Sequence, residues 1–398
     1  MRRQRPGKVR VEVAACLHGL RSVPEEVNKL GVLRGGKSDR PHSLRGYGWG
    51  NNSAGGLGVG SVARALMPVG LALPEGTVDV QGGSDFTVAL TSSGQVWAWG
   101  GNAYGQLGNG SSTRQLTPHL VELPRSVSAA AISVGADHVL VLSRTGSVYG
   151  WGRNLHGQVG NGTTTDCHEP VKLSIGKIAK LATGTASSHA VSSSGSLLSW
   201  GRAINTGRST GLGAVRITEP GSVSLPRGTH VAMVDAGQRH LVLLTDTGQL
   251  LTFGVDPGGR PLPGSVPVSS SWGRVTSISA GDNHTVALTS RNVVLAWGAN
   301  YYGQLGTRDI TNRATPVRVV IPRIRGHIVE VVAGGDFVVA RSSDNEVFTW
   351  GHGRFGQNGD NTKKDQARPH LVALPDRSKV TAVCAGRYHQ LVLTSARR

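Results

Sequence analysis

Cysteines, aromatic residues and acidic residues are all scarce in this chain of 398 residues. The three cysteines, Cys16, Cys167 and Cys384, are remote from one another in sequence, so neither a disulfide framework nor a paired-cysteine metal site is indicated. No run approaches the roughly 18 apolar residues of a membrane-spanning helix. No nucleophile with a positioned base, no paired carboxylates outside the repeats and no metal-ligand cluster is recognisable. We therefore predict a protein without catalytic residues, metal or cofactor, in a reducing compartment.

Glycine, by contrast, is abundant, with 57 residues, and it forms a recurring dipeptide with tryptophan. Copies of Trp-Gly are spaced 44 to 53 residues apart, and Phe253-Gly254 replaces one copy. Self-similarity at such a period is typical of stacked supersecondary units. The copies begin at Trp49, Trp99, Trp151, Trp200, Trp297 and Trp350.

A second marker, Gly-x-x-His or Gly-x-x-Phe, occurs six times, and the longer stretch from Gly184 to His189 is a seventh copy. The marker precedes an apolar run and, in all copies but the last, a short turn and a second β-rich run that ends in Trp-Gly or Phe-Gly. Such runs predict antiparallel hairpins. The histidines recur once per unit, so we interpret them as structural residues that form a buried hydrogen bond to backbone, with phenylalanine replacing two of them. The marker residues are Phe86, His138, His189, His240, His284, Phe337 and His389.

The two ends of the chain complete one unit. The first Trp-Gly, at Trp49, lacks the preceding Gly-x-x-His strand, and the last Gly-x-x-His, ending at His389, lacks a following Trp-Gly strand. Pairing these ends would close a ring and remove free sheet edges. The sequence therefore predicts an all-β, seven-bladed β-propeller over residues 44–398, closed by its N- and C-terminal strands. Its units are 78–123, 130–173, 178–225, 231–268, 275–319, 328–374, and 380–398 joined to 44–73.

These motifs resemble those of the regulator-of-chromosome-condensation (RCC) repeat family. The shared pattern is Ala-Gly-x-x-His followed by Val-x-x-Trp-Gly-x-Asn-x-x-Gly-Gln-Leu-Gly, and it extends over residues 44–398. The resemblance implies a propeller that binds protein partners. In the chromatin-bound exchange factor of this family, one face engages a small GTPase, and a hairpin from one blade enters that GTPase. The irregular turn at 202–219 is a weak candidate for such a hairpin.

Residues 1–43 are a basic N-terminal extension, with ten Lys or Arg against four acidic residues. If residues 9–21 are helical, Val9, Val13, Cys16 and Leu20 share one stripe while arginines lie elsewhere. Arg-rich amphipathic segments of this kind are typical of mitochondrial targeting sequences. The alternative is a disordered basic arm that binds nucleic acid, which would suit a nuclear, chromatin-binding propeller.

Residues that differ between otherwise similar Gly-x-x-His turns are the better candidates for partner binding, because the fold does not require them. We expect them to ring one face near the central channel. By resemblance, Asp282 matches an acidic position of the exchange factor and Asp137 matches one position later, whereas Arg239 and Arg387 depart in charge. The predicted set is Asp85, Asp137, Arg239, Asp282, Asp336, Arg387 and Tyr388.

Positive charge is the remaining signal. The chain has a formal net charge of +18, of which residues 1–43 supply only a third. Such density attracts nucleic acid or acidic protein surfaces, although no aromatic residues alternate with these arginines, as they would in a stacking motif for RNA. The predicted basic surface is Arg202, Arg208, Arg216, Arg318, Arg323 and Arg325.

Two functions of different classes remain open from the sequence. The first is a non-catalytic interaction scaffold, mitochondrial, that docks on an RNA–protein assembly such as the mitochondrial ribosome and contacts RNA backbone. The second is a guanine-nucleotide exchange factor for a small GTPase. A chromatin-binding role is a third and smaller alternative.

Overall fold

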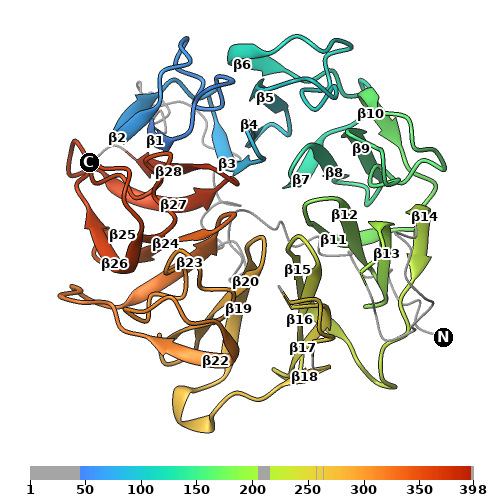
Figure 1. The fold of residues 1–398 in the computed structure, drawn as a ribbon. Helices are drawn as coiled ribbons and strands as arrows, with labels where there is room; N and C mark the ends of the chain where they lie inside the picture. The colour runs from blue at the N-terminus through green and yellow to red at the C-terminus, as the bar shows by residue number, and fades with distance from the viewer. Residues whose placement is uncertain (1–44, 205–215, 257, 263, 396–398) are drawn as a thin grey trace, which may run out of the picture.

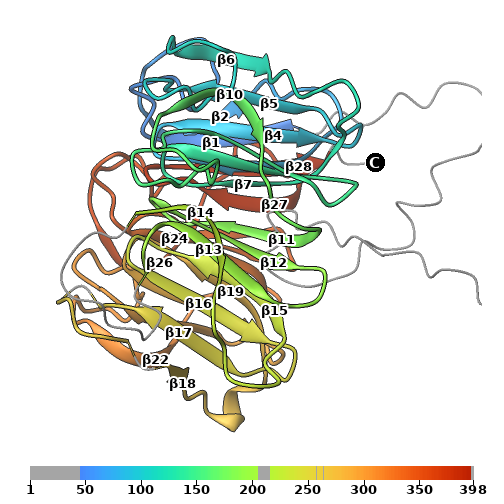
Figure 2. The ribbon, with the colours of Figure 1, turned by 90° about the vertical axis from the view of Figure 1, so that its right-hand side faces the viewer.

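The protein is a ring of seven four-stranded antiparallel sheets around a central axis (Figure 1). The computed structural model describes residues 45–204, 216–256, 258–262 and 264–395. The predicted all-β, seven-bladed propeller is confirmed. Figure 2, turned by 90°, shows the strands running across the thickness of the ring. The basic extension 1–43, Arg208 and most of the irregular turn lie outside the described residues.

Each of blades 1 to 4 is formed by four strands that are consecutive in the chain. Blade 1 comprises β3 (Thr77–Gly82), β4 (Phe86–Thr91), β5 (Val96–Gly100) and β6 (Gln115–Leu120). Blade 2 comprises β7 (Ala129–Val134), β8 (His138–Ser143), β9 (Val148–Gly152) and β10 (Cys167–Lys172). Blade 3 comprises β11 (Ile178–Thr183), β12 (Ser187–Ser192), β13 (Leu197–Arg202) and β14 (Arg216–Ser222). Blade 4 comprises β15 (Val231–Ala236), β16 (His240–Thr245), β17 (Leu250–Gly254) and the short β18 (Ser265–Val266).

Blades 5 and 6 are also formed by consecutive strands, whereas blade 7 combines strands from both ends of the described chain. Blade 5 comprises β19 (Val275–Ala280), β20 (His284–Thr289), β21 (Val294–Gly298) and β22 (Arg313–Val319), preceded by a 3-10 helix, Ser270–Trp272. Blade 6 comprises β23 (Ile328–Ala333), β24 (Phe337–Ser342), β25 (Val347–Gly351) and β26 (Gln366–Val372). In blade 7, β27 (Lys379–Ala385) and β28 (His389–Ser395) join β1 (Arg45–Gly50) and β2 (Ala65–Leu71), and Trp49 lies opposite Gln390 where β1 pairs with β28.

The hydrophobic core is divided among the spaces between neighbouring blades. One cluster, for example, combines Phe86, Val88 and Leu107 of blade 1 with Val139 and Trp151 of blade 2. Every blade therefore buries one face against each neighbour, and no blade has a core of its own. Repeat units that depend on their neighbours in this way gain stability from the interfaces between them.

The tryptophan of Trp-Gly links each blade to the one before it. The Trp151 indole N–H donates to the Gln106 carbonyl at 2.9 Å, and Gly108 of the same turn packs on the indole with a φ of +63°. A Cβ at Gly108 would lie 2.8 Å from the indole nitrogen, so both the backbone angle and the space require glycine. Equivalent bonds are donated by Trp49, Trp99, Trp200 and Trp350 to the carbonyls of Gln357, Gly56, Gln158 and Gln304.

The turn that supplies this carbonyl is held by a buried asparagine. The Asn102 side-chain amide donates to the Ser111 and Thr113 carbonyls, and its oxygen accepts from the Leu107 N–H. In blade 6 the two positions are exchanged in function: Gly353 replaces the asparagine, and Asn358, in the leucine position, donates to the carbonyls of Gly351 and Lys364. The turn therefore keeps its internal amide even where the motif changes.

The repeat histidines are buried, as expected, but in three blades the imidazole contacts a hydroxyl of the next blade and not the backbone. His138 Nε2 lies 2.8 Å from Ser188 Oγ in the next blade, and that hydroxyl donates to the Gln158 carbonyl at 2.7 Å. Because the hydroxyl has only one proton, it accepts from the imidazole. Burial lowers the pKa of His138 to about 3, so the ring is neutral. His240 with Thr285, and His389 with Thr87, form equivalent contacts.

Blade 3 requires a correction to the sequence interpretation. Ser187, and not His189, lies opposite Gly201 at the start of β12, as His138 lies opposite Gly152 in blade 2. The histidine position of blade 3 is therefore occupied by Ser187. The variable residues of this turn are Thr185 and Ala186, since Ser187 and Ser188 already belong to the strand.

We expect the bond from Trp151 to Gln106 to contribute measurably to stability. Trp151→Phe leaves a buried carbonyl without its donor and should lower the free energy of unfolding by about 1–2 kcal/mol more than Trp297→Phe. Trp297 is the matched control because, in the part of the chain that the structure describes, it donates to no such turn carbonyl. Urea unfolding followed by tryptophan fluorescence measures both. Equal losses would show that aromatic packing, and not the bond, stabilises the blade contact.

Candidate functional site

The variable turns and the long turns after Trp-Gly lie at the same end of the ring. In each antiparallel blade the first turn joins strands one and two, and the long turn joins strands three and four, so both turns lie at the same end of the strands. We call this end of the propeller the turn face. Its long turns are 51–64, 101–114, 153–166, 299–312 and 352–365 in the blades where the motif is regular. The opposite end, which we call the link face, carries the short hairpins and the connections between blades.

An ion pair joins two blades that are not neighbours at the centre of the turn face. Arg387 Nε of blade 7 lies 2.8 Å from Asp282 Oδ2 of blade 5, and the side chains are only 27% and 12% exposed. Thr185 of blade 3 also approaches Asp282, with Oγ1 at 3.4 Å from Oδ1. Residues from three blades therefore converge on one carboxylate across the channel mouth.

Asp336 of blade 6 lies beside this pair. Burial and the nearby Asp282 carboxylate raise the pKa of Asp336 from 3.8 to about 6, while Arg387 and a hydrogen bond from Gln304 act in the opposite direction. One arginine thus faces two carboxylates. The pair of acids carries less than two full charges at pH values near 6.

Asp85 and Asp137 form a second acidic group, in blades 1 and 2. Burial, followed by repulsion from Asp137, raises the pKa of Asp85. Asp137 is paired with Arg153 at 3.2 Å, and the Arg153 guanidinium also lies 4.4 Å from the centre of the Tyr104 ring. The Asp137 carboxylate is therefore paired with an arginine of a long turn.

The remaining two predicted turn residues behave differently. Tyr388 is half-buried, and burial raises its pKa, with Asp282, Asp336 and Asp137 adding to the effect and Arg387 opposing it. Arg239 is exposed. The structure therefore brings Asp282, Asp336, Arg387 and Tyr388 into one cluster, places Asp85 with Asp137 in another, and leaves Arg239 exposed on its own turn.

The predicted basic surface is divided between the two faces. Arg202 and Arg216 are cross-strand partners at the turn-face end of blade 3, and together with Arg153 they lower the pKa of His156, after burial. Arg318 is exposed on the outer strand of blade 5, and Arg323 and Arg325 lie in the connection to blade 6, on the link face. These two groups do not form one patch.

A row of aromatic and imidazole rings that the sequence did not predict crosses blades 5 to 7 on the turn face. Tyr302 lies 4.3 Å from His352, His352 is 5.9 Å from Phe355, and Phe355 is 5.4 Å from Tyr388, between ring centres. The Arg64 guanidinium lies 5.3 Å from the Phe355 centre. The signal was present, because an aromatic residue or histidine precedes Gly-Gln in four long turns: Tyr104, His156, Tyr302 and Phe355.

Within the described ranges, no group of three or more His, Cys, Asp and Glu side chains could hold a metal ion. No helix within them is both long enough and apolar enough to cross a membrane.

Fold and site together define a seven-bladed propeller whose turn face presents a charged, partly aromatic surface. The family model of the regulator of chromosome condensation (RCC1) repeat matches residues 45–90, 93–142, 145–191, 292–341 and 344–393. The chain belongs to the RCC1-repeat family. That model leaves residues 192–291 unmatched, which include the irregular turn of blade 3 and the shortened blade 4.

Several characterised proteins are similar over most of the chain. The ultraviolet-B receptor UVR8 of Arabidopsis thaliana is 32% identical over 343 residues, which cover 81% of this chain and 76% of that protein. The mitochondrial RCC1 domain-containing protein RUG3 of the same plant is 29% identical, with 89% of each chain covered. The crystal structure of Prp20p from Saccharomyces cerevisiae, described with its binding to Gsp1p and histones, has a TM-score of 0.77 at 19% identity and covers 96% of each chain. This last likeness shows the shared fold.

The raised pKa of Asp336 predicts a pH dependence of stability. Between about pH 4 and pH 6 the folded chain holds a proton that the unfolded chain has released, so stability should fall as pH rises through this window. Asp336→Asn removes the charge and should raise the free energy of unfolding at pH 7.5 by at least about 1 kcal/mol, with little effect at pH 4. Urea unfolding at both pH values is the measurement.

Asp246→Asn is the control for this variant, since Asp246 is exposed and its substitution should alter stability little at either pH. A loss of stability for Asp336→Asn at pH 7.5 would instead mean that the charged carboxylate is needed by Arg387.

Proposed function

We propose that this protein is a non-catalytic interaction scaffold, resident in mitochondria, that docks on an RNA–protein assembly such as the mitochondrial ribosome. The observation that carries the proposal is an excess of exposed cations on the propeller. Arg318 and Arg323 are exposed, and Arg325 is 83% exposed with Glu346 only at 3.9 Å. At such exposure an ion pair is weak, so these cations are available to an acidic partner.

Mitochondrial residence is supported by similarity and by the N-terminal composition. The relative RUG3 is named as a mitochondrial protein and covers 89% of this chain. Residues 1–43 are rich in arginine and compatible with an amphipathic targeting segment. We propose that this extension directs import and that residues 44–398 form the functional domain.

The geometry around Asp282 favours the scaffold over the exchange factor. Asp282 is the acidic position that the resemblance would assign to GTPase contact, yet its carboxylate is bound to Arg387 at 2.8 Å and is only 12% exposed. Contact with a GTPase through this carboxylate would require breaking a mostly buried ion pair, which costs free energy. The exchange factor therefore remains the second candidate.

Charge reversal on the link face should separate the two functions. We expect the amount of ribonucleoprotein recovered with the triple variant Arg318→Glu, Arg323→Glu, Arg325→Glu to fall at least about ten-fold. The measurement is affinity purification of a C-terminally tagged protein from fractionated cells, at low and high salt, with mass spectrometry of the recovered proteins. Association should also fall with salt, because it depends on exposed charges.

The matched control carries the same change of charge at other exposed cations of the ring, Arg227, Arg377 and Lys379, and should retain its partners. Equal loss in both variants would reject a defined docking surface. Recovery of a small GTPase after nucleotide is stripped, with nucleotide release accelerated by the protein and lost in Asp282→Ala, would overturn the scaffold proposal in favour of exchange activity.

A further inference from the structure

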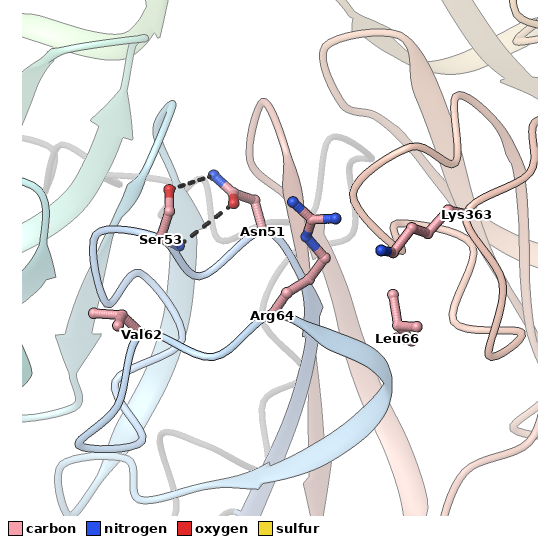
Figure 3. Close-up of a pocket in the computed structure, with 6 residues that line it drawn as sticks. All are labelled: Asn51, Ser53, Val62, Arg64, Leu66 and Lys363. Carbon is pink, nitrogen blue, oxygen red and sulfur yellow. Dashed lines mark hydrogen bonds between the residues drawn. The ribbon is translucent and has the colours of Figure 1, made fainter.

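A polar pocket opens on the turn face where blade 7 meets blade 6. It has a volume of about 440 Å³ and is lined by Asn51, Ser53, Val62, Arg64, Leu66 and Lys363. Figure 3 shows the charged ends of Arg64 and Lys363 facing the same space, from turns of different blades. None of the six lining residues is acidic. Two cations with an amide and a hydroxyl beside them suit an anionic group such as phosphate.

The two carboxylates in the turn of Lys363 already accept hydrogen bonds. Asp360 accepts from Thr362 and Gln366, and Asp365 accepts from the Gly353 N–H. These bonds hold the turn 352–365 in shape. Lys363 of the same turn is exposed, and its charged end faces the pocket (Figure 3).

The row of aromatic rings passes the edge of this pocket at Phe355. Arg64 lines the pocket and also lies over Phe355, from which the row continues through His352 to Tyr302 in one direction and to Tyr388 in the other. Tyr302 is 36% exposed. Aromatic residues are only 5% of the chain, so their concentration beside two cations on an exposed face is not a general property of its surface.

We propose that the turn face over blades 5 to 7 binds single-stranded RNA, with a phosphate in the pocket of Arg64 and Lys363 and bases stacked along the ring row. Cations that follow the backbone together with aromatic side chains that stack on bases are the usual means of binding single strands. A duplex hides its base faces, so the row selects unpaired nucleotides. The inference rests on the proposed function, which it deepens by giving the RNA of the assembly a direct binding surface.

Fluorescence anisotropy with purified full-length protein tests the proposal. The probes are a labelled single-stranded RNA of about 15 nucleotides and a duplex of equal length, with inorganic pyrophosphate and poly-glutamate as competitors. We expect the single strand to bind more tightly than the duplex. Phe355→Leu and Tyr302→Leu should each weaken it about five-fold or more, and Lys363→Gln should reduce the slope of log affinity against log salt by roughly 0.7.

Two control variants are matched to these changes. Tyr104→Leu alters the equivalent position of blade 1, and Arg377→Gln removes an exposed cation of the link face. Both should bind the single strand like the unaltered protein. Lys363→Gln changes an exposed side chain, so it tests the pocket even if Phe355→Leu or Tyr302→Leu fails to fold.

Several outcomes would overturn the inference. These are no RNA binding, equal affinity for the duplex, and equal weakening by the control variants, which would indicate only the overall positive field. Pyrophosphate binding without RNA binding would restrict the pocket to small anions, and displacement of RNA by poly-glutamate regardless of Phe355 would assign the face to an acidic protein. Failure here with ribonucleoprotein still recovered from cells would leave the proposed function standing, whereas RNA binding without such recovery would reject the proposed function alone.

Discussion

The hydrogen bond between one blade's indole and the preceding blade's turn carbonyl is the contact on which the ring depends. It explains why three separate sequence elements are repeated together: the tryptophan donates, Gly-Gln supplies the carbonyl, and the following glycine leaves room for the indole, as Trp151, Gln106 and Gly108 illustrate. In blade 7 the Gly56 carbonyl accepts both the Trp99 indole and the Thr87 hydroxyl of blade 1. One backbone oxygen thus organises two side chains of the next blade.

Among the described residues, this contact is absent on both sides of blade 4, where the sequence departs from the repeat. Blade 4 carries Phe253 in the tryptophan position, and the turn before it is the irregular one that begins after Arg202. Blade 4 in turn has a short last strand and no regular long turn, and Trp297 of blade 5 follows it. Turn and tryptophan are therefore both changed between blades 3 and 4, whereas between blades 4 and 5 the turn is changed and the buried Trp297 is kept.

A ring held by such contacts leaves the turn residues free to vary, and this freedom accounts for the electrostatics. The chain is strongly basic, yet the channel mouth on the turn face contains Asp85, Asp137, Asp282 and Asp336, with Arg387 and Arg153 as partners. Acidic centre and basic periphery coexist because the two sets occupy different turns of the same repeat. A partner would therefore meet different charge at the centre and at the edge.

The sequence by itself determined the fold, the number of blades and the positions that must be glycine or tryptophan, because these follow from local patterns repeated in register. It also identified the variable turns, but not which of them meet. Asp282 and Arg387 are 105 residues apart, and the row from Tyr302 to Tyr388 joins three blades; only closure of the ring places them together. The wrong assignment of His189 to the repeat-histidine position has the same origin. The pairing of β12 with β13 places Ser187, and not the nearest histidine, opposite Gly201. Only the tertiary structure showed that the predicted basic residues lie on two faces. The repeat gives each residue its place within one blade, whereas a surface for a partner depends on which residues of different blades lie together.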